Sequence, residues 1–199
     1  MKWLYDNWMK ATPFLAFYCF ILIFLYVRDV NYALYLIWLQ VIIYWVHEYE
    51  EYIFPAGFLD FFNRNMMKSD RGDYPLTKVG SFWINIPLVY VAMPLSAILA
   101  HFFGLEWGIW TALFSFLNAF AHVGMFFIFK RKYNPGLVVS TLLNIPVAIY
   151  TCWYFWTNNL ITLQNGTISV IIAIIAQASM MIYGFGYLVP KMKREQSEN

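Results

Sequence analysis

The feature that most limits how this chain can fold is a series of long apolar segments separated by short polar breaks. A helix needs about 20 apolar residues to cross a hydrocarbon core of about 30 Å. Six segments meet this requirement: 11–27, 32–54, 81–102, 105–129, 136–156 and 167–189. Because backbone polar groups in lipid need internal partners, such segments form helices. We therefore expect an all-α, polytopic membrane helical bundle of about six transmembrane helices, a single transmembrane domain over residues 1–199.

Composition argues against a soluble domain. Only 12% of the residues are charged and 61% are hydrophobic, whereas about 25% are charged in an average soluble domain. The net charge is +2, and no long basic run is interleaved with aromatic residues, so we expect no nucleic-acid partner. The two cysteines, Cys19 and Cys152, lie in apolar segments without metal-ligand or disulfide spacing, and are interpreted as small buried hydrophobic residues.

Lysines and arginines divide unequally between the two sides of the predicted bundle. With six spans, twelve of them fall on one side and only Arg28 falls on the other. Short cytoplasmic loops retain Lys and Arg preferentially, so we expect the basic side to be cytoplasmic. Both termini then lie in the cytoplasm, and residues 190–199 form a short polar cytoplasmic tail. We expect an integral protein of the cell (inner) membrane of a bacterium, with the lipid bilayer as its partner.

The second apolar segment ends in a cluster of ionisable residues with the sequence HEYEE, residues 47–51. Residues three or four apart share a helix face, so His47 aligns with both Glu50 and Glu51. Glu48 points about 100° away from this face and is not assigned to the site. The resulting polar stripe consists of Gln40, Tyr44, His47, Glu50 and Glu51. Ionisable groups inside a bilayer are costly and mark functional sites by default.

A second histidine lies at matching depth on the fourth segment. With a rise of about 1.5 Å per residue, His47 lies roughly 10 Å and His122 roughly 12 Å from the inner ends of their segments. Asn118 shares a helix face with His122, and Asn85 and Asn144 come within a turn or two of the same level. We therefore predict one intramembrane site near the cytoplasmic face, with these three asparagines as supporting polar residues.

A purely structural reading of these residues is also open. The glutamates at the end of the second segment could lie in headgroup water, and His122 could form an ordinary interhelical hydrogen bond. Negative charge at a helix C-terminus opposes the helix dipole, however, so helix stability does not explain the carboxylates. The combination of two histidines and two carboxylates at one depth favours the functional reading.

The motifs together resemble a known family. The spacing from His47 to Glu51 matches H-x-x-E-E, His122 follows, and residues 133–136 match Y-x-P-G. This order resembles the HXXEE-domain family, integral membrane proteins of unknown function named for that motif, over roughly residues 30–190. The resemblance implies that His47, Glu50, Glu51, His122 and the turn belong to a shared site or scaffold. It implies no reaction.

Two looser similarities frame the chemistry. The Glu-Glu pair with a distant histidine is similar to the intramembrane CAAX-type proteases, but that family expects an arginine where this chain has Pro55 and a phenylalanine where it has Asn118. His47 with Glu51 is similar to the H-x-x-x-E pair of membrane sterol isomerases. Both similarities are analogies in the kind of site and assign no activity.

The leading hypothesis from these residues is a membrane-embedded enzyme, a hydrolase or isomerase acting on a lipid or lipid-like substrate. His47, Glu50, Glu51 and His122 are the candidate catalytic residues, and they also form a candidate site for a divalent metal, Zn or Fe. No organic cofactor is implied. Without a metal, the same groups would act as acid and base. The alternatives are a small transporter or proton- or ion-binding membrane protein, and a non-catalytic regulatory or immunity-type membrane protein.

Overall fold

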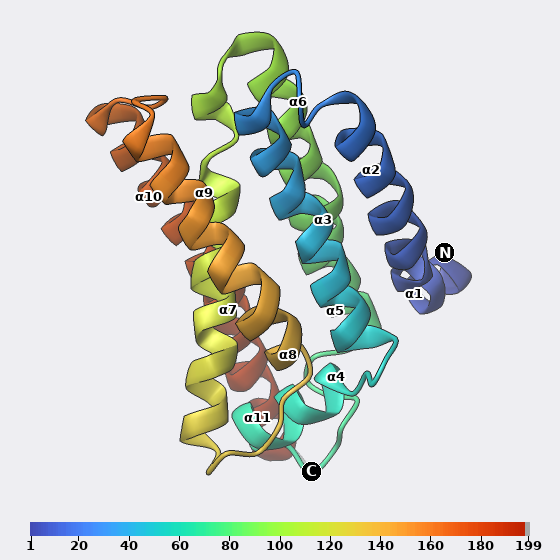
Figure 1. Ribbon diagram of the computed structural model, residues 1–199. Coiled ribbons are helices and arrows are strands. Elements are labelled where there is room, and N and C mark those ends of the chain that lie inside the picture. The colour runs from blue at the N-terminus through green and yellow to red at the C-terminus, as the bar shows by residue number, and fades with distance from the viewer. Residues whose placement is uncertain (198–199) are drawn as a thin grey trace.

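The structure, a computed structural model, describes residues 1–197, which form helices and connecting loops without a strand (Figure 1). The first helical rod comprises α1 (Lys2–Asn7), a 3₁₀ turn and α2 (Thr12–Tyr26), and the second is α3 (Tyr32–Tyr52). After α4 (Phe58–Phe61), the third rod runs through α5 (Lys78–Asn85), a π-helical segment (Ile86–Ala92) and α6 (Met93–Phe103).

The second half of the chain supplies three further rods. A 3₁₀ turn (Leu105–Trp107) leads into α7 (Trp110–Ile128). The next rod comprises α8 (Leu137–Val139), a π-helical segment (Ser140–Asn144) and α9 (Ile145–Thr157). The last comprises α10 (Leu163–Met181), a π-helical segment (Ile182–Leu188) and α11 (Val189–Ser197). The predicted tail, residues 190–199, thus belongs to α11 as far as residue 197, and residues 198–199 lie outside the described part.

Five helices among the described residues are long and apolar enough to cross a membrane. They cover Lys2–Tyr26, Lys78–Phe103, Leu105–Ile128, Leu137–Thr157 and Leu163–Glu195. This pattern is that of an integral membrane protein. The remaining long helix, α3, has 21 residues and so spans about 31 Å, but it is less apolar than the five.

Helix α3 lies inside the bundle and packs against α2, α6, α7 and α9 (Figure 1). The side chain of Asn31 caps its start by accepting a hydrogen bond from the amide of Leu34 at 2.9 Å. Its end at Tyr52 precedes Pro55, which lacks a donor N–H and cannot continue a helix. Because neighbours surround α3, its polar side chains are buried whichever way they point. This burial brings the HEYEE cluster into the protein interior rather than to headgroup water.

One loop closes the end of the bundle at which α4, α8 and α11 gather (Figure 1). We call this the basic end, because the loops after α3 and α7 carry six of the thirteen Lys and Arg residues and α11 carries three more. The fully buried Asn63 holds the loop: its amide donates to the carbonyls of Gly72 and Leu76, and its Oδ1 accepts from the Leu76 amide at 2.8 Å. The polar stretch after α4 is therefore a folded cover.

Candidate metal centre

Three of the predicted ligands converge in the interior. Glu51 Oε1 lies 3.4 Å from His47 Nε2 and 3.3 Å from His122 Nε2. One ligand atom from each of the three residues lies within 4.8 Å of the other two. The side chains are almost completely buried, with 1% of His47, 5% of Glu51 and 3% of His122 exposed. We call these three residues the His/Glu cluster.

Two neighbouring helices, α3 and α7, bring the three residues of the cluster together. His47 and Glu51 are one turn apart on α3, and His122 reaches them from α7. The two imidazole rings lie nearly perpendicular, with centroids 4.7 Å apart. Two helices packed side by side therefore supply three ligand atoms at one point, as in metal sites built within helix bundles.

Asn134, in the loop after α7, holds His122 in one ring orientation. His122 Nδ1 lies 2.8 Å from Asn134 Oδ1, and the Asn134 amide donates to the backbone carbonyl of His122 at 3.1 Å. With Nδ1 donating its proton to Asn134, Nε2 of His122 presents a lone pair to the cluster. Metal-binding histidines are commonly oriented by such a partner on the other ring nitrogen.

His47 has polar neighbours on both sides of its ring. Ser140 Oγ lies 3.4 Å from Nδ1, and Asn118 Nδ2 lies 3.4 Å from Nε2. Ser140 Oγ can accept a hydrogen bond from the Nδ1–H group, which leaves the lone pair of Nε2 directed toward Glu51. Asn118, predicted as a supporting residue, therefore contacts the cluster directly.

The Y-x-P-G segment forms a tight turn against both histidines. Gly136 has φ +96° and ψ −14°, and the Leu137 amide donates to the carbonyl of Asn134 at 3.1 Å. These values define the type II turn that the order Asn-Pro-Gly favours. A Cβ on Gly136 would lie 2.6 Å from His47 Cε1 and 2.7 Å from His122 Cε1. The backbone at Gly136 thus lies so close to the two imidazoles that no residue with a Cβ fits at this position.

Glu50 is not brought together with the His/Glu cluster. Its Oε1 accepts hydrogen bonds from the Tyr133 hydroxyl at 2.8 Å and the Val138 amide at 3.0 Å, and its Oε2 accepts from the Val139 amide at 2.7 Å. The carboxylate thereby accepts hydrogen bonds from backbone amides that have no partner within the helix where α8 begins. Burial and the bond to Glu50 raise the pKa of Tyr133, so the phenol stays a donor. Glu50 ties the turn to α3, and the structure supplies no free oxygen of it for a ligand.

Glu48, left out of the predicted site, faces a cavity beside the cluster. The cavity has a volume of about 70 Å³, enough for water, and both Glu51 and His122 line it. Glu48 is 1% exposed, and its Oε2 has no hydrogen-bond partner in the described structure. Tyr52 lines the same cavity and accepts hydrogen bonds from Ser81 and Asn85, which leaves its own proton free to donate.

The other predicted supporting residues lie at different distances from the cluster. Tyr44 packs against the His47 ring, with centroids 5.3 Å apart and ring planes tilted by 51°, and Asn85 lines the cavity. Gln40 instead donates to Thr151 on α9 at 2.9 Å, and Asn144 donates to Ser115 on α7 at 2.8 Å. These last two join helices away from the ligand atoms.

The charge and spacing of the cluster would allow it to hold a cation. Glu48, Glu50 and Glu51 are all buried, yet no Lys or Arg in the described structure forms an ion pair with them. Ligand atoms around 2.0–2.1 Å from a tetrahedral zinc lie about 3.4 Å from one another, which matches the distances from Glu51 to the two imidazoles. A divalent ion would also supply the positive charge that these buried carboxylates lack.

The individual contacts of several site residues were not predicted from the sequence. Asn134, Ser140 and Tyr133 touch the cluster or Glu50, but they come from the loop and helix start after α7, and helix periodicity says nothing of contacts across a loop. The available signal was the Y-x-P-G match itself, which placed Tyr133 and Asn134 in a shared scaffold. For Glu48, the available signal was that the segment is apolar on every face, which is typical of a helix packed inside a bundle.

Comparison with known proteins places the chain in a family. Residues 38–151, more than half of the chain, match the family described as "Protein of unknown function with HXXEE motif". Neither the curated proteins nor the solved structures yielded a match. The matched region runs from within α3 to within α9 and so contains the His/Glu cluster, Glu50 and the Gly136 turn. This chain belongs to the HXXEE family of proteins of unknown function.

Proposed function

We propose that this protein is a membrane-embedded hydrolase that uses a divalent metal ion, held by His47, Glu51 and His122, to act on a lipid-like substrate. The observation that carries this proposal is the position of the cluster: three ligand atoms converge, and two of the residues that supply them, Glu51 and His122, line a small cavity. Catalytic zinc sites keep three protein ligands and leave a further position for water or substrate. The same ligand set also suits Fe(II), which metal analysis distinguishes.

The cavity supplies the other groups that hydrolysis needs. A divalent ion bound at the cluster would act as a Lewis acid and lower the pKa of a nearby water to about 7. Glu48, whose Oε2 has no partner, is placed to accept the proton of that water and return it to the leaving group. The Tyr52 hydroxyl would donate a hydrogen bond to the substrate oxygen on which negative charge develops.

We also propose six membrane spans with both termini in the cytoplasm. The five apolar helices and the 21-residue α3 together make six crossings. Only Arg28 then falls on the outer side, as the preference of Lys and Arg for cytoplasmic loops favours. The His/Glu cluster would lie in the cytoplasmic half of the bilayer.

Metal content tests the proposed site. We expect about one zinc or iron per chain in the purified wild type, because the cluster offers one three-ligand site. His122→Ala should lose the metal. His101→Ala is the matched control, since His101 is exposed at the end of α6 and should leave the content unchanged. Element analysis by mass spectrometry gives the numbers, and folded wild type without metal after supply of Zn²⁺ and Fe²⁺ would refute the site.

Activity is tested separately with the metal-loaded protein in phospholipid vesicles of phosphatidylethanolamine and phosphatidylglycerol. We expect new lipid products by mass spectrometry that are missing with His122→Ala. Loaded protein that leaves every lipid unchanged would contradict hydrolysis of these lipids and favour a transport or regulatory role for the same metal site.

Asn134 provides a graded test of the orientation of His122. Asn134→Ala removes the acceptor on Nδ1, and loss of such a partner lowers metal affinity by about 10- to 100-fold. Asn144→Ala, which removes another buried amide that binds Ser115, should keep the affinity of the wild type. Zn²⁺ titration against a competing chelator measures both, and equal affinities in the two variants would contradict the assigned role.

A further inference from the structure

We propose that a groove on the outside of the bundle binds the hydrocarbon chain of a membrane lipid and leads its polar end to the His/Glu cluster. This inference rests on the proposed function and names the route and class of its substrate. The groove lies between the rod of α5 and α6 and the rod of α10, two of the helices apolar enough to span the membrane.

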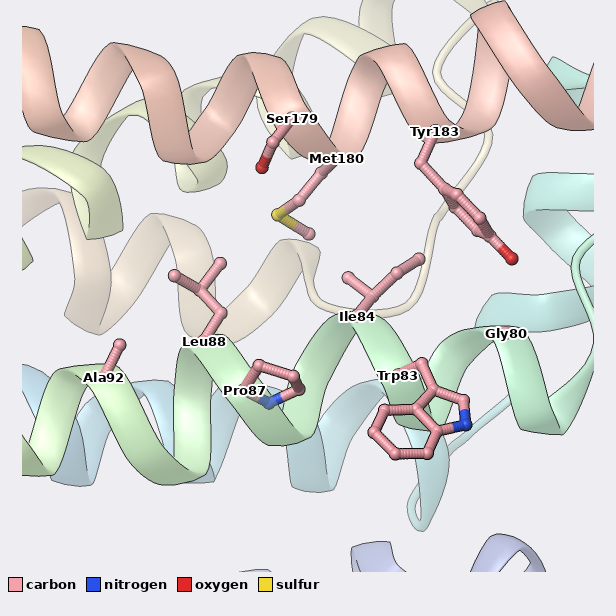
Figure 2. Close-up of a pocket in the computed structure, with 9 residues that line it drawn as sticks. All are labelled: Gly80, Trp83, Ile84, Pro87, Leu88, Ala92, Ser179, Met180 and Tyr183. Atoms are coloured by element: carbon pink, nitrogen blue, oxygen red, sulfur yellow. The ribbon is translucent and has the colours of Figure 1, made fainter.

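Figure 2 shows the two walls of this groove. One wall carries Trp83, Pro87, Leu88 and Ala92, and the facing wall carries Ser179, Met180 and Tyr183. Its volume is about 410 Å³, which is within the range of about 300–1,000 Å³ for ligand pockets. The lining is mostly apolar and contains no charged residue. A hydrocarbon chain matches this chemistry, whereas an ion or a sugar does not.

Two side chains separate the groove from the cavity. Ile84 and Met180 line both the groove and the cavity that holds Glu48, Glu51 and His122. In Figure 2 they point from opposite helices toward the space between the two walls. The barrier therefore consists of side chains and not of backbone, and a methionine side chain in particular changes conformation readily. A change of side-chain rotamer at these two positions would join the groove to the cavity without moving a helix.

The approach to the cavity from the basic end is covered. At the basic end, Phe58 of α4 and Phe62 and Leu76 of the folded cover line the cavity, and the buried Asn63 holds that cover in place. Water-soluble substrates arriving from the basic end would have to displace this segment. Approach from the lipid, along the groove, requires no such displacement.

The backbone beside the groove is also irregular. A π-helical segment, Ile86–Ala92, forms part of one wall, and another, Ile182–Leu188, carries Tyr183 of the other. π-Helical turns occur frequently at functional sites, because they redirect side chains within a helix. Their presence on both walls agrees with a binding role for this surface.

A second groove on the bundle provides the comparison. It has a volume of about 540 Å³, lies between α2, α3 and α9, and is lined by residues such as Phe17, Leu39 and Val147. It shares no lining residue with the cavity of the cluster. Lipid in this second groove would therefore have no direct route to the cluster.

Photo-cross-linking tests the route. Metal-loaded full-length protein is placed in phosphatidylglycerol vesicles that contain a phospholipid with a diazirine beside its ester carbonyl, and adducts are mapped by mass spectrometry after illumination. We expect adducts on Glu48 or Tyr52, inside the cavity.

Ala92→Trp should abolish these cavity adducts by filling the groove, and Ser179→Trp repeats this test from the facing wall. Val147→Trp, which adds the same ring to the second groove, should retain them.

Adducts confined to the outer surface of the wild type would overturn the proposal, as would cavity adducts that survive both groove substitutions. Metal content is measured on the same samples and reports that each variant is folded around its site. Bound metal without cavity adducts refutes the lipid route alone, while cavity adducts on protein that binds no metal refute the metal site and support the route.

Discussion

Glu51→Gln and Glu50→Gln are expected to have opposite effects, although the two residues are neighbours in one motif. Glu51→Gln should lower metal affinity by more than about 100-fold, because it removes a ligand rather than a neighbour of a ligand. The variant should remain folded, since Glu51 contacts the two imidazoles and holds no backbone amide. Glu50→Gln should keep the metal and lower the free energy of unfolding.

The cost at Glu50 follows from its three donors. A carboxylate accepts from Tyr133, Val138 and Val139, whereas an amide offers a single oxygen and adds two donors of its own. Hydrogen bonds to charged groups contribute about 1.5–3 kcal/mol each, so we expect a loss of about 2 kcal/mol or more. Thermal unfolding in detergent measures stability and element analysis measures metal. Loss of metal in Glu50→Gln with unchanged stability would contradict the assignment of both glutamates.

Gly136→Ala is expected to destroy the cluster geometry. The added methyl group would lie 2.6 Å from His47 and 2.7 Å from His122, so both imidazoles must move. Alanine is also strained at φ +96°. Overpacking of this kind costs about 1–3 kcal/mol, and the displaced ligands should release the metal. We expect a lower unfolding temperature together with loss of bound zinc or iron.

Gly124→Ala is the control for that experiment. Gly124 lies on α7, the helix that carries His122, and a Cβ there meets no atom within 4 Å. Replacing a helical glycine by alanine stabilises a protein by roughly 0.5–1 kcal/mol. The metal content should equal that of the wild type. A Gly136→Ala protein that behaves like Gly124→Ala would show that the close approach of the turn is not required.

Each predicted segment corresponds to a helical rod in the structure. An apolar segment in lipid must satisfy its own backbone hydrogen bonds, so it forms a helix. The segment predicted over 32–54 is α3, Tyr32–Tyr52, and the segment over 105–129 is the rod Leu105–Ile128. Apolar length and proline positions are local properties that a sequence displays directly. The internal π-helical segments, such as Ile86–Ala92, were not predicted, because they depend on packing between rods.

Helix spacing and depth were sufficient to predict three members of the site. His47, Glu51 and His122 were predicted from one shared face and one matching level, and their ligand atoms meet. The same reasoning placed Glu50 with them, because residues three and four positions after His47 both lie on its face of the helix. It excluded Glu48 because it assumed that only one face of α3 looks inward. In the structure, α3 has neighbours all round, and its carboxylates divide between the cluster, the turn and the cavity.

Hydrophobic length and helical periodicity are both local, so the sequence was enough to predict a bundle of apolar helices and to predict that His47, Glu51 and His122 lie at one level of it. The role of each carboxylate depends instead on the tertiary structure. The turn after α7 is far from α3 in the sequence, yet Gly136 packs against both histidines and Asn134 orients His122. Backbone amides just after this turn donate hydrogen bonds to Glu50. Contacts between segments distant in sequence depend on how the helices pack, which no local pattern records.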